Sequence, residues 1–206
     1  MKRSIIPLSI ALLTLLAPAT ATAGGPVQID PALMQPPLNQ SFAPWTCLRQ
    51  GSGITCVGHR TIVRDGEENG LVCDGRPVYT DEIDERTQRR YGDANGLALR
   101  TVQNVDIRGI MGFNPDLSGI TVRGAGHFQE TFEYLVPGDI TTRTDRYTGL
   151  DGYVVAPGLG RILLDVGVKT FDFDGNLLFN HGYQEVLWYG DAAFEQICDA
   201  LIYLGA

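Results

Sequence analysis

Glu130 is the residue whose sequence surroundings most favour acid–base chemistry. The run 120–136 alternates between apolar or small residues and polar ones, and this period of two places Glu130 on one strand face with Phe128, Phe132 and Tyr134. Burial among apolar side chains disfavours the charged form of a carboxyl group and raises its pKa. A carboxyl group with a pKa near the working pH exchanges protons efficiently, so Glu130 and Tyr134 are candidate catalytic residues.

A structural role for Glu130 is the alternative. Burying a lone carboxylate costs several kcal/mol, so an inward arginine could pair with it and lower its pKa instead. Asp165 lies in a similar position among Leu163, Leu164 and Val166, and it is the third candidate for catalysis. The candidate lining of a ligand cavity is Phe128, Phe132 and Tyr134.

The familiar catalytic and metal-binding motifs are missing from the sequence. It contains no G-x-S-x-G or S-x-x-K nucleophile motif, no H-E-x-x-H motif and no phosphate-binding glycine loop. Residues 172–176 resemble the start of a calcium loop, but the apolar run after them indicates a turn between two strands. We therefore expect no metal and no cofactor.

The candidate residues lie in segments that read as strands. Residues 97–108 alternate in the same way as 120–136, and Gly124 and Gly126 on the inner face of the second segment would let it bend. Residues 161–172 and 176–188 flank a short turn with glycine at its end, which predicts a hairpin.

The period changes at the C-terminal end of the chain. Asp191 is a plausible N-cap, and apolar residues recur after it at spacings of three and four, which predicts a helix ending near Gly205. We therefore predict an all-β fold, an antiparallel β-barrel or a strongly curled sheet of about seven or eight strands, with one C-terminal α-helix. The apolar positions of the helix are Phe194, Ile197, Cys198, Leu201 and Ile202.

Four cysteines predict two disulfide bonds in an oxidising compartment. A two-residue Gly-Ser turn in the hairpin 45–57 places Cys47 opposite Cys56, at a spacing that a disulfide can bridge. This pairing leaves Cys73 to bond with Cys198, which would tie the C-terminal segment to the sheet.

The first residues of the chain predict export. Residues 1–23 combine a basic start, an apolar run and a small-x-small cleavage site after Ala23, which is the plan of a secretory signal peptide. We expect a proline-rich extended leader over 24–44, lying on or trailing from the domain, and a single domain over 45–206. The predicted location is extracellular, with no membrane insertion after cleavage.

Charge argues against nucleic acid as a partner. Two of the 16 basic residues and none of the 24 acidic residues lie in 1–23, so the exported chain has 14 basic residues and a net charge of −10. Binding to phosphates requires clustered lysine and arginine, which this composition does not favour. The oligomeric state has no signal in the sequence.

The C-terminal part of the sequence carries a family resemblance. The run GRILLDVGVKTFDFDGNLLFNHGYQEVLW, with VPGD before it and FEQICDAL after it, resembles small secreted bacterial β-barrel proteins that are uncharacterised. It is also similar to the curled barrels of the dirigent and allene oxide cyclase type, which implies guiding or cyclising a small apolar substrate. The catalytic residues of those families have no one-to-one counterparts in this sequence, so none is assigned.

We expect a secreted, disulfide-stabilised β-barrel that binds a small apolar ligand or a surface partner without catalysis. The alternatives are a cofactor-free isomerase or cyclase acting on a small apolar substrate, and a structural module of the cell envelope. The volume of any cavity distinguishes them, because side chains alone can fill a barrel of about eight strands. A cavity of several hundred Å³ would favour the first two functions.

Overall fold

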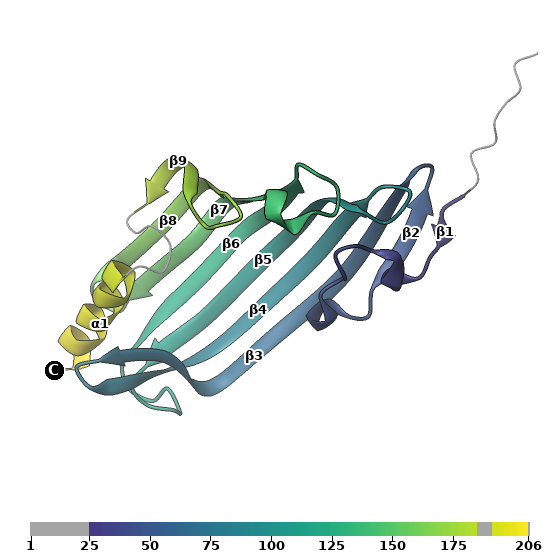
Figure 1. The fold of residues 1–206 in the computed structure, drawn as a ribbon. Coiled ribbons are helices and arrows are strands. Elements are labelled where there is room, and N and C mark those ends of the chain that lie inside the picture. The colour runs from purple at the N-terminus through teal and green to yellow at the C-terminus, as the bar shows by residue number, and fades with distance from the viewer. Residues whose placement is uncertain (1–24, 185–190, 206) are drawn as a thin grey trace, which may run out of the picture.

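A computed structural model describes residues 25–184 and 191–205, which form one antiparallel sheet and a C-terminal helix (Figure 1). Nine strands lie in chain order, each paired with the one before it. The signal peptide predicted over 1–23 lies outside the described residues. The strands are β1 (Val27–Gln28), β2 (Thr46–Gln50), β3 (Gly53–Cys73), β4 (Arg76–Gly92), β5 (Ala98–Gly112), β6 (Thr121–Tyr134), β7 (Arg143–Ala156), β8 (Gly160–Phe171) and β9 (Leu177–Gln184). The helices are η1 (Pro31–Leu33), η2 (Gln40–Phe42), η3 (Ile140–Thr142) and α1 (Asp191–Gly205).

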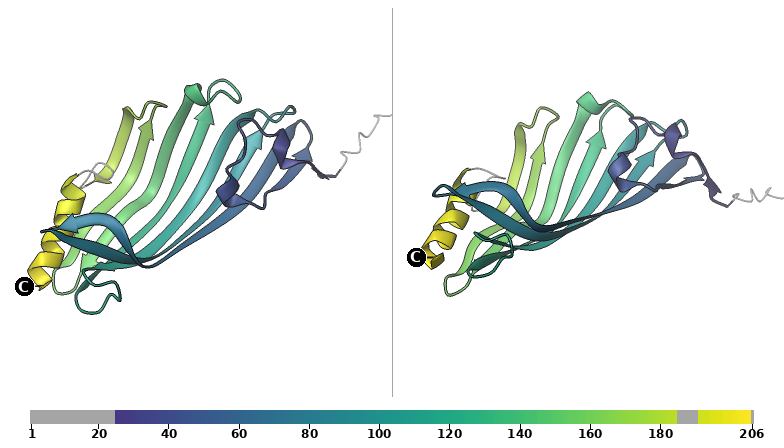
Figure 2. Two further views of the ribbon diagram at one scale, coloured as in Figure 1. Left: turned by 60° about the horizontal axis from the view of Figure 1, so that its bottom comes forward. Right: turned by 90° about the horizontal axis from the view of Figure 1, so that it is seen from below.

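The sheet curls without closing into a barrel (Figure 2). Among the described residues, no strand pairing joins β1 to β9, and the sheet has nine strands instead of the predicted seven or eight. Of the two predicted architectures, the structure has the curled sheet. Both the N-terminal segment and α1 lie on its concave face (Figures 1 and 2).

Three glycines in register allow the backbones of β7, β8 and β9 to approach closely. Gly149 pairs with Gly167, which pairs with Gly182, and their φ angles are 128°, 156° and 130°. A Cβ atom at Gly167 would lie 2.3 Å from the carbonyl oxygen of His181, so no larger residue fits there without a shift of the backbone. Glycine at these positions therefore removes the side chains that would keep the three strands apart, and its conformational freedom permits a sheet to curve.

Helix α1 covers one end of the concave face. Ile197 and Leu201 pack on Val78 and Val122 in the largest apolar cluster of the described residues. The predicted Cys73–Cys198 disulfide is present and joins α1 to the tip of the β3–β4 hairpin, with the two Cα atoms 5.2 Å apart. The apolar period of the C-terminal segment thus marked the face of the helix that meets the sheet.

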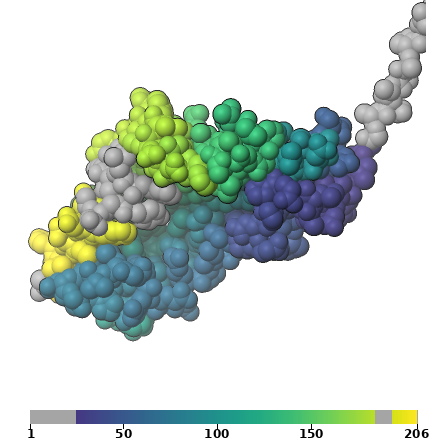
Figure 3. Space-filling model, in the orientation of Figure 1, coloured from purple at the N-terminus to yellow at the C-terminus, as the bar shows by residue number. Residues whose placement is uncertain are grey.

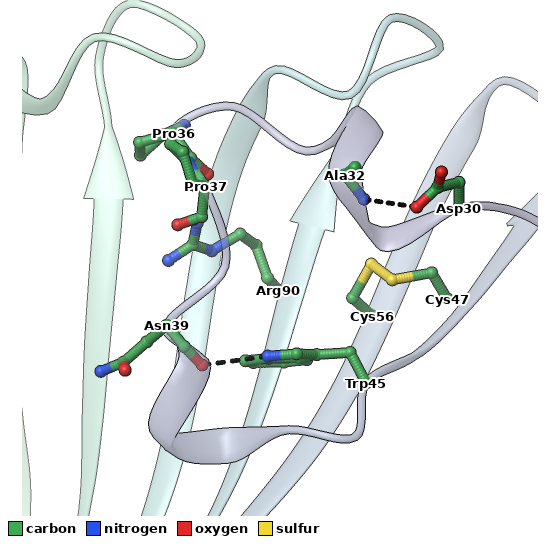
Figure 4. The surroundings of a disulfide bond; sticks show 9 residues. All are labelled: Asp30, Ala32, Pro36, Pro37, Asn39, Trp45, Cys47, Cys56 and Arg90. Carbon is green, nitrogen blue, oxygen red and sulfur yellow. Dashed lines mark hydrogen bonds between the residues drawn. A yellow bond between two sulfur atoms is a disulfide. The ribbon is translucent and has the colours of Figure 1, made fainter.

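The N-terminal segment covers the other end of the same face. Met34, Leu38 and Phe42 are buried, so the proline-rich segment lies on the sheet as part of the core. The predicted hairpin register is also present: Cys47 pairs with Cys56 and bonds to it, with the Cα atoms 4.0 Å apart. Figure 4 shows this disulfide together with the contacts of the N-terminal segment on β2–β4.

Candidate functional site

The middle of the concave face, between the N-terminal segment and α1, is polar. One row of side chains runs across five neighbouring strands in register, and every member is buried. The face is recessed over β4–β6 in the space-filling view (Figure 3). The row consists of Gln88, Gln103, Glu130, Tyr147 and Lys169.

Glu130 is held in this row by one hydrogen bond and one looser ion pair. The side-chain amide of Gln103 donates to its Oε2 atom at 2.5 Å, and Nη1 of Arg86 lies 3.8 Å from its Oε1 atom. Burial raises the pKa of Glu130 to about 7, and Arg86 opposes this rise without cancelling it. Nearby carboxylates, Asp151 first, raise the pKa further. Both influences considered from the sequence are therefore present, and burial dominates.

The raised pKa of Glu130 makes stability depend on pH. The protonated Glu130 side chain contributes fully to the stability of the fold below about pH 4.5, where the folded and unfolded chains both hold the proton. This contribution is lost as the pH rises through about 7, because the buried carboxyl group then ionises. We expect Glu130→Gln to be more stable than the wild type at about pH 8 by up to about 3 kcal/mol. Urea unfolding at about pH 5 and about pH 8 measures the difference. The prediction would be contradicted if the free energy of unfolding changed equally with pH in both proteins, or if NMR gave Glu130 a pKa near 4.3.

Two arginines lie side by side next to Glu130. Arg60 of β3 pairs with Arg86 of β4, and both side chains are on the concave face. The Nε atom of Arg86 donates a hydrogen bond to Oδ1 of Asp84 at 2.8 Å. The Nη2 atom of Arg60 is farther from the same carboxylate, 3.9 Å from its Oδ2 atom. The Nε atom of Arg60 is buried and has no hydrogen-bond partner among the described residues. Burial first, and Arg86 second, lower the pKa of Arg60.

A buried ion cluster occupies the β7–β8 side of the face. Lys169 is 2 % exposed and contacts Asp165, while its Nζ atom lies 3.0 Å from Oδ2 of Asp151. The pairing of β7 with β8 shifts register between Leu150 and Gly152, so Asp151 occupies a bulge. Bulges redirect side chains, which explains why Asp151 reaches Lys169. Burial raises the pKa of Asp165 and Lys169 lowers it.

A cavity of about 140 Å³ lies between this polar region and the core beneath α1. Glycines from β5, β6 and β7 leave part of its wall without side chains. Ile107, Met111 and Val154 supply apolar lining, and Glu82 and Asp151 supply carboxylates. Such a lining suits a ligand group that is partly apolar and partly polar. The glycines are Gly109, Gly124, Gly126 and Gly152.

The predicted site residues lie on one face but do not all meet. Glu130 and Asp165 are buried there as predicted, and Phe128 packs on Tyr147 with the ring centroids 6.4 Å apart. Tyr134 is four residues from Glu130 along β6, roughly 13 Å at the rise of a strand. Phe132 lies under the guanidinium group of Arg143. None of the three aromatic candidates lines the cavity.

Several residues of the site were not predicted from the sequence. One available signal was Lys169, the only lysine after residue 23, which the strand alternation places on the same face as Asp165. The unpredicted residues are Arg60, Asp84, Arg86, Gln103, Tyr147, Asp151 and Lys169.

Comparison with protein families, curated proteins and solved structures gave no match. The resemblances noted in the sequence therefore stay predictions. Within residues 25–184 and 191–205, no helix is long and apolar enough to cross a membrane. In the same part of the chain, no group of three or more histidine, cysteine or acidic side chains is placed to hold a metal ion. What the fold and site define is a curled antiparallel sheet with a small cavity on its concave face.

Proposed function

We propose that this protein binds a small ligand in the cavity of the concave face, without catalysing a reaction. The observation that carries the proposal is the glycine-lined wall of that cavity. Ile107, Met111 and Val154 give it apolar contact surface, and Glu82 and Asp151 offer hydrogen-bond acceptors. A concave, partly apolar space with a few polar groups is the usual form of a small-molecule site.

The glycine at position 124 argues against a purely structural face. A Cβ atom there would meet only the terminal methyl of Met111, at 3.7 Å, which is ordinary contact. Its backbone conformation is also open to other residues, because its φ is outside the left-handed region. Glycine inside a strand is destabilising by roughly 0.5–1 kcal/mol relative to alanine, so a face selected only for stability would carry a larger residue.

The size of the cavity limits the ligand. A cavity of roughly 150 Å³ accepts a benzene-sized molecule in the engineered apolar example, and the present cavity has about 140 Å³. It is below the several hundred Å³ that would by itself favour a ligand site over a structural module, so the proposal depends on the glycine wall and not on the volume. The cavity therefore admits one ring-sized group, and any remaining part of the ligand extends along the recessed face seen in Figure 3.

Gly124→Val tests the proposal by filling the cavity. We expect the variant to lose binding of 3-phenylpropanol, a neutral one-ring probe, at least tenfold, while its melting temperature is equal to or above that of the wild type. NMR titration of the Met111 and Val154 methyl groups measures the binding. Gly53→Ala is the matched control, because its Cβ would lie 3.6 Å from the nearest atom, at the opposite end of the sheet. Unchanged binding in Gly124→Val, or no binding by the wild type, would overturn the proposal.

One observation favours the alternative of an isomerase or cyclase. A Glu130 pKa of about 7 suits a group that takes and returns a proton near neutral pH. However, Glu130 is 7 % exposed and does not line the cavity, so its carboxyl group has no demonstrated contact with a ligand there. Binding without turnover is therefore the function that the geometry supports best.

A further inference from the structure

We infer that the ligand of the concave cavity is a cation, a protonated amine attached to a ring-sized apolar group, and that its ammonium group bonds to Asp151. This inference rests on the proposed binding function and assigns the chemical class of the ligand. Three features of the site support it: the charges that line the cavity, the contacts of Asp151, and the backbone that places this residue at the glycine wall.

The charged side chains that line the cavity are both acidic. Glu82 and Asp151 are the two charged residues of the described lining, whereas Arg64 and Lys169, the cations that contact them, lie outside it. The rest of the lining is mostly apolar side chains and glycine. A charged group that enters this space therefore meets carboxylates first, which favours a cation over an anion.

Asp151 has one carboxylate oxygen that a ligand can reach. Its Oδ2 atom accepts a hydrogen bond from Nζ of Lys169 at 3.0 Å, whereas its Oδ1 atom has no hydrogen bond among the described residues. The Oδ1 atom of Asp165 is also unpaired there, but it is closed off from solvent, and Oδ1 of Asp151 is not. The Asp151 side chain is only 9 % exposed, so an ion pair at this position is screened less than one at the surface.

The ion cluster around Lys169 contains more carboxylates than cations. Lys169 contacts Asp165 most closely and Asp151 second, so the three groups together carry one excess negative charge when both carboxyl groups are ionised. Burial is the main cause that raises the pKa values of Glu130 and Asp165, and the charge of Asp151 raises both further. A mostly buried charge without a full counterion is costly, and a bound ammonium group would balance it.

The arginines of the same face do not balance Asp151. The pair Arg60–Arg86 lies next to two carboxyl groups, and these four charges cancel once Glu130 ionises above about pH 7. Two further arginines each bond to a carboxylate of their own, at 2.7 Å. At about pH 8, Asp151 is therefore the carboxylate of this region without a cation of its own. The two further pairs are Arg64 with Glu82 and Arg143 with Asp145.

The backbone places Asp151 directly at the glycine wall of the cavity. Asp151 occupies the bulge of β7, and its carbonyl oxygen lies 3.0 Å from the position that a Cβ atom of Gly126 would take. Bulges direct side chains toward functional sites in many proteins. Because Gly124 and Gly126 carry no side chains, an apolar ring can lie against this wall while an ammonium group on a short spacer bonds to the carboxylate.

Three probes of equal length differ in the charge of one end group. At about pH 8, 3-phenylpropylamine is a cation because alkyl ammonium groups have a pKa near 10, 3-phenylpropanol is neutral, and 3-phenylpropionate is an anion. NMR titration of the Met111 and Val154 methyl groups at this pH gives the dissociation constant of each probe. We expect the wild type to bind the amine at least tenfold more tightly than the alcohol, and the propionate more weakly than the alcohol.

Asp151→Asn removes the charge and keeps the size of the side chain. Lys169 keeps its contact with Asp165, so we expect the variant to fold, which circular dichroism checks. The amine and the alcohol should bind this variant within about threefold of one another, and the alcohol should bind it as it binds the wild type. Asp106→Asn is the matched control, because Asp106 is 49 % exposed on the convex face, and it should keep the full preference for the amine.

Failure of the inference is distinguishable from failure of the proposed function. If the alcohol binds and the amine binds no more tightly, or if Asp151→Asn keeps the preference for the amine, the cavity is a ligand site and the cation inference is wrong. If Gly124→Val binds the amine as the wild type does, the amine lies outside the cavity and the inference is overturned. If neither probe binds the wild type, the proposed function is overturned and the inference with it. The comparison of probes in the wild type decides even if Asp151→Asn does not fold.

Discussion

Replacing Cys73 and Cys198 together by serine is expected to lower the free energy of unfolding by about 5 kcal/mol. The disulfide joins residues 125 positions apart and fixes α1 against the tip of the β3–β4 hairpin. Without it, the unfolded chain gains the entropy of a long open loop, and the loss is comparable to the whole stability of many domains. Urea unfolding followed by circular dichroism measures the change.

The second disulfide provides the matched control. Cys47 and Cys56 are 9 positions apart, so replacing both by serine should lower the free energy of unfolding by only about 2.5 kcal/mol. The same denaturant and probe apply to both pairs. Equal losses from the two pairs, or an unchanged midpoint for the Cys73/Cys198 variant, would contradict the loop argument.

Lys169→Met is expected to destabilise the protein by about 3–5 kcal/mol at neutral pH. The change removes the only described cation in contact with Asp151 and Asp165 and leaves the two carboxylates buried together. The loss should shrink as the pH falls, because protonation of the carboxylates relieves their repulsion. Urea unfolding at about pH 7 and about pH 4.5 gives both values.

A triple variant separates charge from packing in this cluster. Lys169→Met combined with Asp151→Asn and Asp165→Asn removes every charge of the cluster, so much of the lost stability should return. If the triple variant were as unstable as Lys169→Met alone, loss of packing would explain the effect, and the ion cluster would contribute little.

The parts of the fold that the sequence predicted are those with one apolar face. Strand β6 alternates because Val122 and Phe128 face the concave side while Arg123 and His127 face solvent. The same contrast predicts the β8–β9 hairpin and the amphipathic helix α1. The Cys47–Cys56 pairing followed from turn length alone, since a two-residue turn fixes the register.

Strand β4 was not predicted from the sequence because both of its faces are polar. Asp84, Gln88 and Arg90 are buried on the concave side, so the residues that face inward there carry no apolar period. This explains why the partners of Glu130 were not found: Arg86 lies on that strand. The bulge at Asp151 is a second cause, because a register shift moves a residue to a face that simple alternation does not assign.

The open sheet and the packed N-terminal segment also depend on features outside local patterns. Whether β1 and β9 meet is decided by the curvature of the whole sheet, which no single strand reveals. With its five prolines, the segment 24–44 shows no regular spacing of apolar residues that would have predicted burial. Met34 and Phe42 are nevertheless fully or almost fully buried. The sequence therefore predicted the inward position of Glu130 and Asp165, but not the groups that meet them.

Native mass spectrometry of the protein purified from its natural source tests the proposed binding function most directly. We expect the wild type to carry a small non-covalent ligand, and Gly124→Val, isolated in the same way, to lack it. A wild type whose mass equals that of the polypeptide with two disulfides, or a ligand that Gly124→Val retains, would contradict binding in the concave cavity.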